Sequence, residues 1–351
     1  MAVVEQKQQN APAAAGQVAS LDDYVKGESL WLDAWRRLRR NRAALFGLVV
    51  IVFWILVAIF APWIAPKDYQ TQVLVDNNAA PRWIIDMFPA MIAKDDGGYV
   101  TVSDAYPLGA DALGRDLLSR IIFGARVSLA VAFIGPLTAF LVGMFVGLAA
   151  GYAGGRLDNF LMRIVDLMYA FPTLLFIIML MTFFRTSFAS PQPGTLAYTL
   201  GQLDSQSGGM LFIFIGIGLT SWMGLARLTR GQVLSVREKE YIEAARSLGT
   251  PTRRILSAHI LPNILGPIII AETLAIPTYI SYEAFLSFIG LGVNPPTPSW
   301  GMMIAEGSRM IGSYPHQALF PALALFSIMF AFNFLGDGLR DALDPRMRGV
   351  D

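Results

Sequence analysis

Long blocks without a single charged residue constrain this chain more than any other feature of its sequence. Asp, Glu, Lys and Arg are absent from residues 43–66, 127–155, 167–184, 205–226 and 310–336. A helix that crosses a bilayer needs about 20 mostly apolar residues. The blocks therefore predict an all-α membrane protein, and they exclude an ordinary soluble domain or a disordered chain.

The composition removes several other classes. Only 15% of the 351 residues are charged, against about 25% in globular domains. The formal net charge of +1 provides no basic field, so we expect no nucleic-acid partner. The chain has no cysteine, which excludes disulfides and thiolate metal sites.

Six transmembrane helices account for the apolar pattern. We place them near residues 44–65, 127–152, 160–184, 209–226, 264–283 and 316–336. The stretch 284–305 is also free of charge, but Asn294, Pro295, Pro296 and Pro298 interrupt it. Because a helix in lipid cannot lose that many backbone hydrogen bonds, we expect a loop or a re-entrant segment on the outer side there.

The distribution of positive charge orients the helices. Six spans put both termini on one side, and that side carries 19 of the 27 Lys and Arg residues when Arg163 is counted at the membrane edge. Cytoplasmic loops of membrane proteins carry the excess of Lys and Arg. We therefore expect cytoplasmic N and C termini.

The N-terminal region divides into a tail and a helix ahead of the membrane domain 43–351. Residues 1–28 are polar, without an apolar run, and predict a disordered cytoplasmic tail. Over 29–42, Trp31, Trp35 and Leu38 recur at i, i+4 and i+7 among arginines, which favours an amphipathic helix on the membrane surface. The alternative is a plain basic stop before the first span.

The external loop 66–126 is too long for a bare connector. Near its end, Leu113, Leu117 and Ile121 share one helical face, and Asp111 is a suitable cap. This pattern predicts a helix at the outer surface. A simple lead-in to the second span explains the spacing equally well.

The cytoplasmic loop 227–263 contains the pattern with the clearest functional meaning. Residues 240–249 predict a short helix that ends at Gly249 in a left-handed cap. Thr250 and Pro251 then predict a second helix, which should stop before Pro262. Small side chains at Ala244 and Ala245 would let another backbone approach closely. Such a projection fits a docking site, and a self-packed linker is the alternative.

Two carboxylates in the fifth predicted span need an explanation. A charge at the centre of a bilayer costs about 2.5–3.5 kcal/mol on insertion scales, so neither Glu272 nor Glu283 should face lipid. Both are candidates for the lining of a translocation path or for a subunit interface, with bonding to neighbouring helices or loops as the alternative. Asp166 is expected to pair with Arg163, three residues away on the same helix.

The chain has no energy source of its own. It contains no Gly-x-x-x-x-Gly-Lys phosphate loop and no His-Glu-x-x-His motif. Energy for transport must therefore come from a partner or from an ion gradient. A gradient-driven carrier would want paired charges within its spans and inverted repeats, and only Glu272 lies well inside a span.

The cytoplasmic loop resembles the EAA loop of ABC-importer permeases. Glu243-Ala244-Ala245 is followed by Gly249, and Leu261-Pro262 come twelve and thirteen residues after that glycine. The run His259 to Asn263 is similar to the same point in peptide-type permeases. Further segments resemble C-type subunits of dipeptide and oligopeptide permeases: 107–116, 124–129, 151–155 with Asp158, 285–292, 299–301 and 336–346.

The resemblance implies a type I importer bundle and a division of labour. This chain would be a non-enzymatic permease in a bacterial or archaeal plasma (inner) membrane, forming half of a path for di- or oligopeptides, or for nickel or a nickel chelate. Its partners would be a second permease in a heterodimer, two cytoplasmic ABC ATPases and an external binding protein. The chain itself would hold no cofactor, because ATP and Mg²⁺ bind the ATPases. The residues from Glu243 to Gly249 would form the coupling helix.

Overall fold

The computed structural model describes residues 30–188 and 192–343, and within them the chain is helical, with three isolated β-bridges and no strand. The disordered tail predicted for 1–28 lies outside the described residues. The helices are α1 Leu30–Arg40, α2 Arg42–Ile64, α3 Arg82–Met87, α4 Leu117–Thr138, α5 Met144–Ala153, α6 Gly155–Tyr169, α7 Thr173–Ser187, α8 Leu196–Gln206, α9 Met210–Arg237, α10 Glu240–Ser247, α11 Thr252–Arg254, α12 Leu261–Phe288, α13 Trp300–Ser308 and α14 His316–Leu343.

The fold class predicted from the apolar blocks is confirmed. Five helical stretches among the described residues are long and apolar enough to span a membrane: Arg42–Ile64, Leu117–Ala153, Met210–Arg237, Thr252–Phe288 and His316–Leu343. The pair α6 and α7 makes a sixth if it counts as one span, with a bend of 80° between its halves. The structure therefore offers five or six candidate spans where six were expected, and two of them are much longer than predicted.

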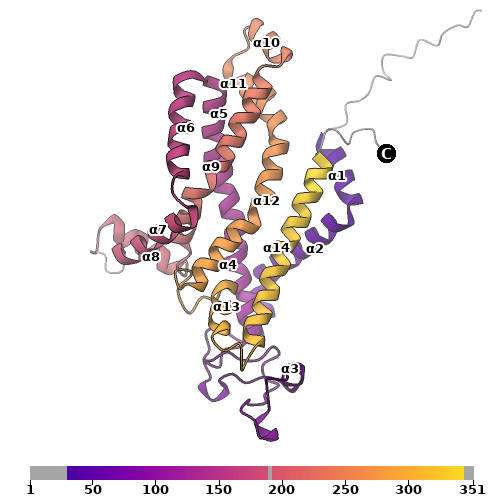
Figure 1. The fold of residues 1–351 in the computed structure, drawn as a ribbon, viewed down its shortest axis with the longest axis vertical. Helices are drawn as coiled ribbons and strands as arrows, with labels where there is room; N and C mark the ends of the chain where they lie inside the picture. The colour runs from indigo at the N-terminus through magenta and orange to yellow at the C-terminus, as the bar shows by residue number, and fades with distance from the viewer. Residues whose placement is uncertain (1–29, 189–191, 344–351) are drawn as a thin grey trace, which may run out of the picture.

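The third predicted span, 160–184, is not a continuous helix. It breaks between Tyr169 and Thr173, where Pro172 precedes the first turn of α7. A residue before proline disfavours helical geometry, and proline cannot donate the hydrogen bond that would continue the helix. α6 lies beside α5, whereas α7 and α8 extend sideways from the bundle (Figure 1).

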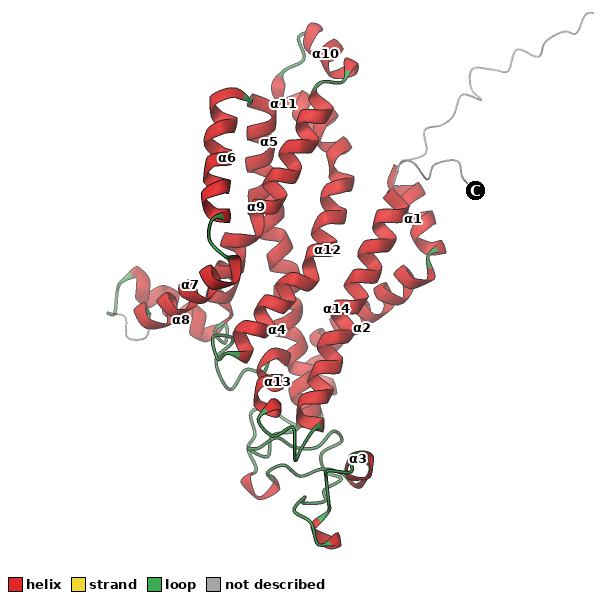
Figure 2. Cartoon of the chain, viewed as in Figure 1, coloured by secondary structure: helices red, strands yellow, loops and turns green. Residues whose placement is uncertain are grey.

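The bundle has two distinct ends. α10 lies at the same end as α1 and the C-terminal turn of α14, and α13 and α3 lie at the opposite end (Figure 2). We call these the α10 end and the α13 end. The predicted topology requires the loop 227–263 and both termini to share one side, and this arrangement agrees with it. Which end faces the cytoplasm stays a prediction.

Glycines bring α5 against α9. Gly143, Gly147 and Gly151 are spaced four residues apart, so they share one face of the helix. A Cβ atom on Gly147 would lie 2.5 Å from the Cβ of Thr229, and one on Gly151 would lie 2.8 Å from the Cβ of Val233. Small residues at this spacing allow close helix contact in membranes.

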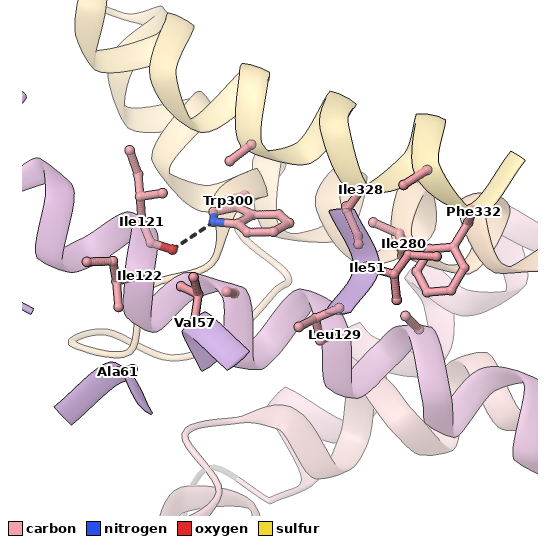
Figure 3. Close-up of a cluster of buried hydrophobic side chains, with 14 of the residues drawn as sticks. Ile51, Val57, Ala61, Ile121, Ile122, Leu129, Ile280, Trp300, Ile328 and Phe332 are labelled. Atoms are coloured by element: carbon pink, nitrogen blue, oxygen red, sulfur yellow. Dashed lines mark hydrogen bonds between the residues drawn. The ribbon is translucent and has the colours of Figure 1, made fainter. Parts of the chain in front are cut away.

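The main core lies toward the α13 end, where helices from both halves of the chain converge. Trp300 of α13 is fully buried, and its indole N–H donates to the carbonyl of Ile121 at 2.9 Å (Figure 3). Its ring lies 4.8 Å from that of Trp54 in α2, edge to face. The hydrogen bond satisfies the one polar group of Trp300, so α13 is fixed against α2 and α4 without an unpaired donor.

The predicted helix at 111–121 begins later than expected. α4 starts at Leu117, and its cap is Asp116, whose Oδ2 accepts from the N–H of Ser119 at 2.7 Å. Burial raises the pKa of Asp116, although the bonds from Ser119 oppose this. Asp111 instead closes a turn, accepting from the N–H groups of Leu113 and Arg115. The prediction of a separate surface helix is therefore wrong. Residues 117–121 instead form the first turn of the helix that continues into the second span.

The helix α1 packs against the end of α14 as well as presenting an exposed side. Leu38 and Ala34 are buried in a cluster with Ala44 and Ala342, and Trp35 remains 47% exposed. The helix face predicted to lie on lipid is therefore only partly exposed. Leu38 packs against protein, whereas Trp35 is half-exposed. Contact of the exposed side with the membrane surface stays a prediction.

Candidate coupling and transport site

The loop predicted to dock a partner projects from the α10 end as a short, sharply terminated helix. At its C-terminus the N–H of Thr250 donates to the carbonyl of Ala245 at 3.0 Å, and the N–H of Gly249 donates to that of Arg246 at 2.9 Å. Gly249 has a φ of +76°, in the left-handed region. This pair of bonds is the Schellman motif, which a glycine at this position makes without strain. The predicted glycine cap is therefore present.

One side of α10 anchors it to the bundle. Ile242 is fully buried in a cluster with Ile255, Ile260 and Val233. Ala245 lies one turn further on and is 8% exposed. Because these contacts join α10 to α9 and to the helix leading into α12, a force on α10 reaches both.

The other side of α10 is exposed. Leu248 is 86% exposed and Tyr241 is 45% exposed, and the side chains of Glu243 and Ala244 are exposed beside them. Tyr241, Ala244 and Leu248 are spaced at i, i+3 and i+7, so they follow one face. The two alanines of the motif therefore differ in environment. Ala244 is exposed, whereas Ala245 packs against the bundle.

The chain after Gly249 differs from the predicted second helix. The side chain of Thr250 makes no cap, and the N-cap position of α11 is Pro251. The helix also does not stop before Pro262: a π-helical turn, Ile255–Ile260, joins α11 to α12. A wide π-helical turn alters the bonding just where Pro262 lacks a donor. Leu261 packs against the anchoring cluster and Pro262 is exposed.

Sequence reasoning missed the links that hold α5 and α6 to this loop. Arg230 binds the buried carboxylate of Asp158 through two bonds of 2.5 and 2.6 Å. Arg237 donates to the carbonyl of Gly151 at 2.9 Å. The ring of Tyr152 lies 5.3 Å from the guanidinium of Arg246 in α10. The turn at 151–155 is thus in contact with the coupling loop.

The predicted pair of Asp166 and Arg163 is wrong. Asp166 accepts a bond of 2.6 Å from Arg227 of α9, whose guanidinium also lies 4.0 Å from the ring of Tyr169. The side chains of Arg227 and Asp166 are 46% and 59% exposed. Two charges are therefore accessible on helices that belong to predicted spans.

Glu272 and Glu283 are both buried within α12. Glu272 is 9% exposed and accepts a hydrogen bond of 3.3 Å from the hydroxyl of Tyr279. Glu283 is fully buried, accepting from Ser287 at 2.7 Å and from Ser128 of α4 at 3.4 Å. Neither faces outward from this chain, and their assignment to a path or an interface stays a prediction.

The described part of the chain contains no group of three His, Asp or Glu residues placed to hold a metal ion. Its ionisable residues instead pair across helices.

Comparison with known proteins identifies the family. The model of the family described as "Binding-protein-dependent transport system inner membrane component" matches residues 143–349, and that of the "N-terminal TM domain of oligopeptide transport permease C" matches 29–81. The chain belongs to this transport family. As a permease of that family it is an inner-membrane component, and its role is transport rather than catalysis.

Curated relatives match the permease over most of its length. It is 38% identical to the oligopeptide transport system permease protein OppC of Haemophilus influenzae, over 92% of this chain and 91% of the relative. Identity to OppC of Escherichia coli is 40%, over 92% and 94%, and identity to the dipeptide transport system permease protein DppC of Bacillus subtilis is 37%, over 93% and 89%. The resemblance inferred from the motifs is therefore confirmed.

A solved structure gives a weaker match. An inward-facing MetNI methionine ABC transporter covers 65% of the permease at 18% identity, with a TM-score of 0.49. A likeness at this level supports no inference about conformation or cargo.

Proposed function

We propose that this permease is one of two membrane subunits of an ATP-driven ABC importer for di- or oligopeptides. The observation that carries this function is the identity of 37–40% to oligopeptide and dipeptide permeases over more than nine-tenths of the chain. The assembly contains a second permease, two cytoplasmic ATPases that bind ATP and Mg²⁺, and an external binding protein. The chain itself binds no cofactor.

The exposed face of α10 is the docking surface for one ATPase in this proposal. Leu248 and Tyr241 supply apolar area on a projection that otherwise exposes charged side chains. Apolar side chains that lie together on one exposed face can mark an interaction site, whereas single exposed apolar residues need no explanation. The α10 end then faces the cytoplasm, in agreement with the excess of Lys and Arg on that side.

Motion of the ATPase reaches the spans through α12. Ile242 anchors α10 to the residues that open the helical stretch Thr252–Phe288, which is 37 residues long. Because this stretch has no flexible linker, displacement of α10 moves the fifth span directly. The link from Tyr152 to Arg246 carries the same displacement to α5.

The exposed pair of Asp166 and Arg227 is a candidate for the wall of the path. Charged residues in spans face water or another subunit, because lipid contact costs several kcal/mol. This pair is accessible on the isolated chain, so the second permease or a water-filled passage covers it in the assembly. The buried Glu283 instead links α12 to α4, because it accepts a hydrogen bond from Ser128.

The proposed function is tested by uptake in proteoliposomes that contain both permeases and both ATPases. With the binding protein outside and ATP inside, labelled di- and oligopeptides should accumulate, and vanadate should stop this. Uptake driven by a proton or sodium gradient without ATP would contradict the proposal. Accumulation of nickel or a nickel chelate without peptide would reassign the cargo.

A further inference from the structure

A cluster of ions at the α13 end, buried except for the half-exposed Glu306, has no place in the coupling machinery. Arg115 donates to Asp111 at 2.6 Å and to Glu306 at 3.2 Å. Arg120 donates to Glu306 at 2.8 Å and also pairs with Asp111. Arg115 is 5% exposed and Arg120 is 1% exposed. The cluster joins the turn before α4 to α13, across more than 180 residues of sequence.

A cavity of about 250 Å³ lies against this cluster. Its lining includes three arginines, Arg115, Arg120 and Arg309, and two carboxylates, Asp111 and Glu306. One positive charge is therefore left without a counterpart in the lining. The rest of the wall is largely apolar, with Leu113, Met303 and Met310 among its residues.

Two of the three guanidinium nitrogens of Arg120 have no hydrogen-bond partner. Its Nη1 makes the ion pairs, but its Nε and Nη2 have no hydrogen-bond partner although both are buried. A buried donor without a partner bears the full cost of its lost hydration, and the cost is greater for a charged group. The cavity lining thus combines an excess positive charge with a buried guanidinium, that of Arg120, two of whose nitrogens have no partner.

We propose that this cavity binds the carboxylate of a small ligand. A guanidinium matches the planar, two-oxygen geometry of a carboxylate. A single excess positive charge fits a monoanion better than a phosphate dianion, and the apolar wall fits a side chain next to the carboxylate. The identification of the ligand as the C-terminal residue of a peptide rests on the proposed function.

Equilibrium binding to the full-length permease in lipid nanodiscs tests the site without ATPases or transport. Saturation-transfer NMR would compare the dipeptide Ala-Leu with its C-terminal amide. We expect Ala-Leu to bind about tenfold or more tightly than the amide, because bonds to a charged acceptor are the stronger ones. Equal binding of the two peptides would overturn the assignment.

Variants locate the binding within the cavity. Arg309 is exposed, so Arg309→Gln leaves the folded core intact and should weaken Ala-Leu binding several-fold. Arg82→Gln is the control, because Arg82 is at the same end but pairs with Asp86 and Asp96 outside the cavity. Arg120→Gln should abolish binding, and Glu306→Gln should strengthen it by removing a competing carboxylate. Equal effects of Arg309→Gln and Arg82→Gln would contradict the site.

The outcome is separable from that of the proposed function. Preference for the free carboxylate in nanodiscs, together with failed peptide uptake in the full transporter, would contradict the function and leave the site standing. Normal uptake without that preference would do the reverse. If Arg309→Gln weakened docking of the binding protein but not Ala-Leu binding, the cavity would serve a protein side chain and the small-ligand assignment would be wrong.

Discussion

The two ends of the bundle hold their shape in different ways. At the α10 end, a helix of eight residues is defined by local bonds around Gly249 and presents most of its surface outward. At the α13 end, the buried Arg120 pairs with the buried Asp111 and with the half-exposed Glu306, which is 186 residues away in the sequence. The first arrangement suits a part that another protein grips, and the second suits a part that must keep its shape unaided.

The largest effect should come from removing a charge at the α13 end. Asp111→Asn leaves the buried guanidinium groups of Arg115 and Arg120 with Glu306 as their remaining acid, and breaking a buried pair costs about 3–5 kcal/mol. Thermal unfolding of the purified permease should show a large drop in its midpoint. Asp86→Asn, which removes an exposed partner of Arg82 at the same end, is the control and should leave the midpoint unchanged. Similar midpoints for both variants would remove the contrast between the ends.

The next largest effect should follow loss of the anchor at the α10 end. Ile242→Ala removes a fully buried side chain, and such truncations cost about 2–5 kcal/mol. Amide hydrogen exchange should accelerate in α10 while α13 stays protected. Leu248→Ala, at an 86% exposed position, should leave exchange unchanged yet weaken association with the ATPase. If Leu248→Ala had no effect on association, the docking surface would lie elsewhere.

A smaller loss of stability is expected from substituting a left-handed glycine at either end of the bundle. Gly249 and Gly97 both have a left-handed φ, +76° and +79°, and a Cβ on either would meet no atom within 4 Å. Substituting valine at either position should therefore cost a similar amount, about 1–2 kcal/mol, from the left-handed backbone. Only Gly249→Val should reduce ATPase association and uptake. Unchanged association and uptake in Gly249→Val would contradict the coupling role.

The smallest change in stability is expected for the exposed pair of Asp166 and Arg227. Asp166→Asn should alter the free energy of unfolding by less than about 1 kcal/mol, because both partners are about half exposed. Peptide uptake should nevertheless fall if the pair lines the path. Exchanging the two residues, with Asp166→Arg and Arg227→Asp, distinguishes the roles: full recovery of uptake would point to a structural ion pair instead.

The sequence predicted what depends on neighbouring residues and missed what depends on distant ones. Gly249 could be assigned a left-handed cap because the cap bonds span only a few residues. Pro172 by itself indicates a break in the helix, but the apolar residues on both sides of it favour one continuous span. Nothing near Asp166 in the sequence indicates that its partner is Arg227, 61 residues away.

The same limit applies to the ion cluster. The helical face that follows Asp111 predicts a helix cap there, whereas the observed cap is Asp116, five residues on. Glu306 joins Arg115 and Arg120 only after α13 has folded back over α4. Charge pairs of this kind depend on packing, so spacing along the chain does not reveal them.

The length of the helical stretch from Thr252 to Phe288, which includes the π-helical turn, has a mechanical consequence. At 1.5 Å per residue, its 37 residues extend about 55 Å, well beyond the roughly 30 Å of hydrocarbon in a bilayer. In the proposed importer, nearly half of its length then lies outside the lipid tails, on the side of the ATPase. Under the proposed coupling, a push on the protruding part exerts torque on the embedded part, so movement of the ATPase would tilt the helix within the membrane.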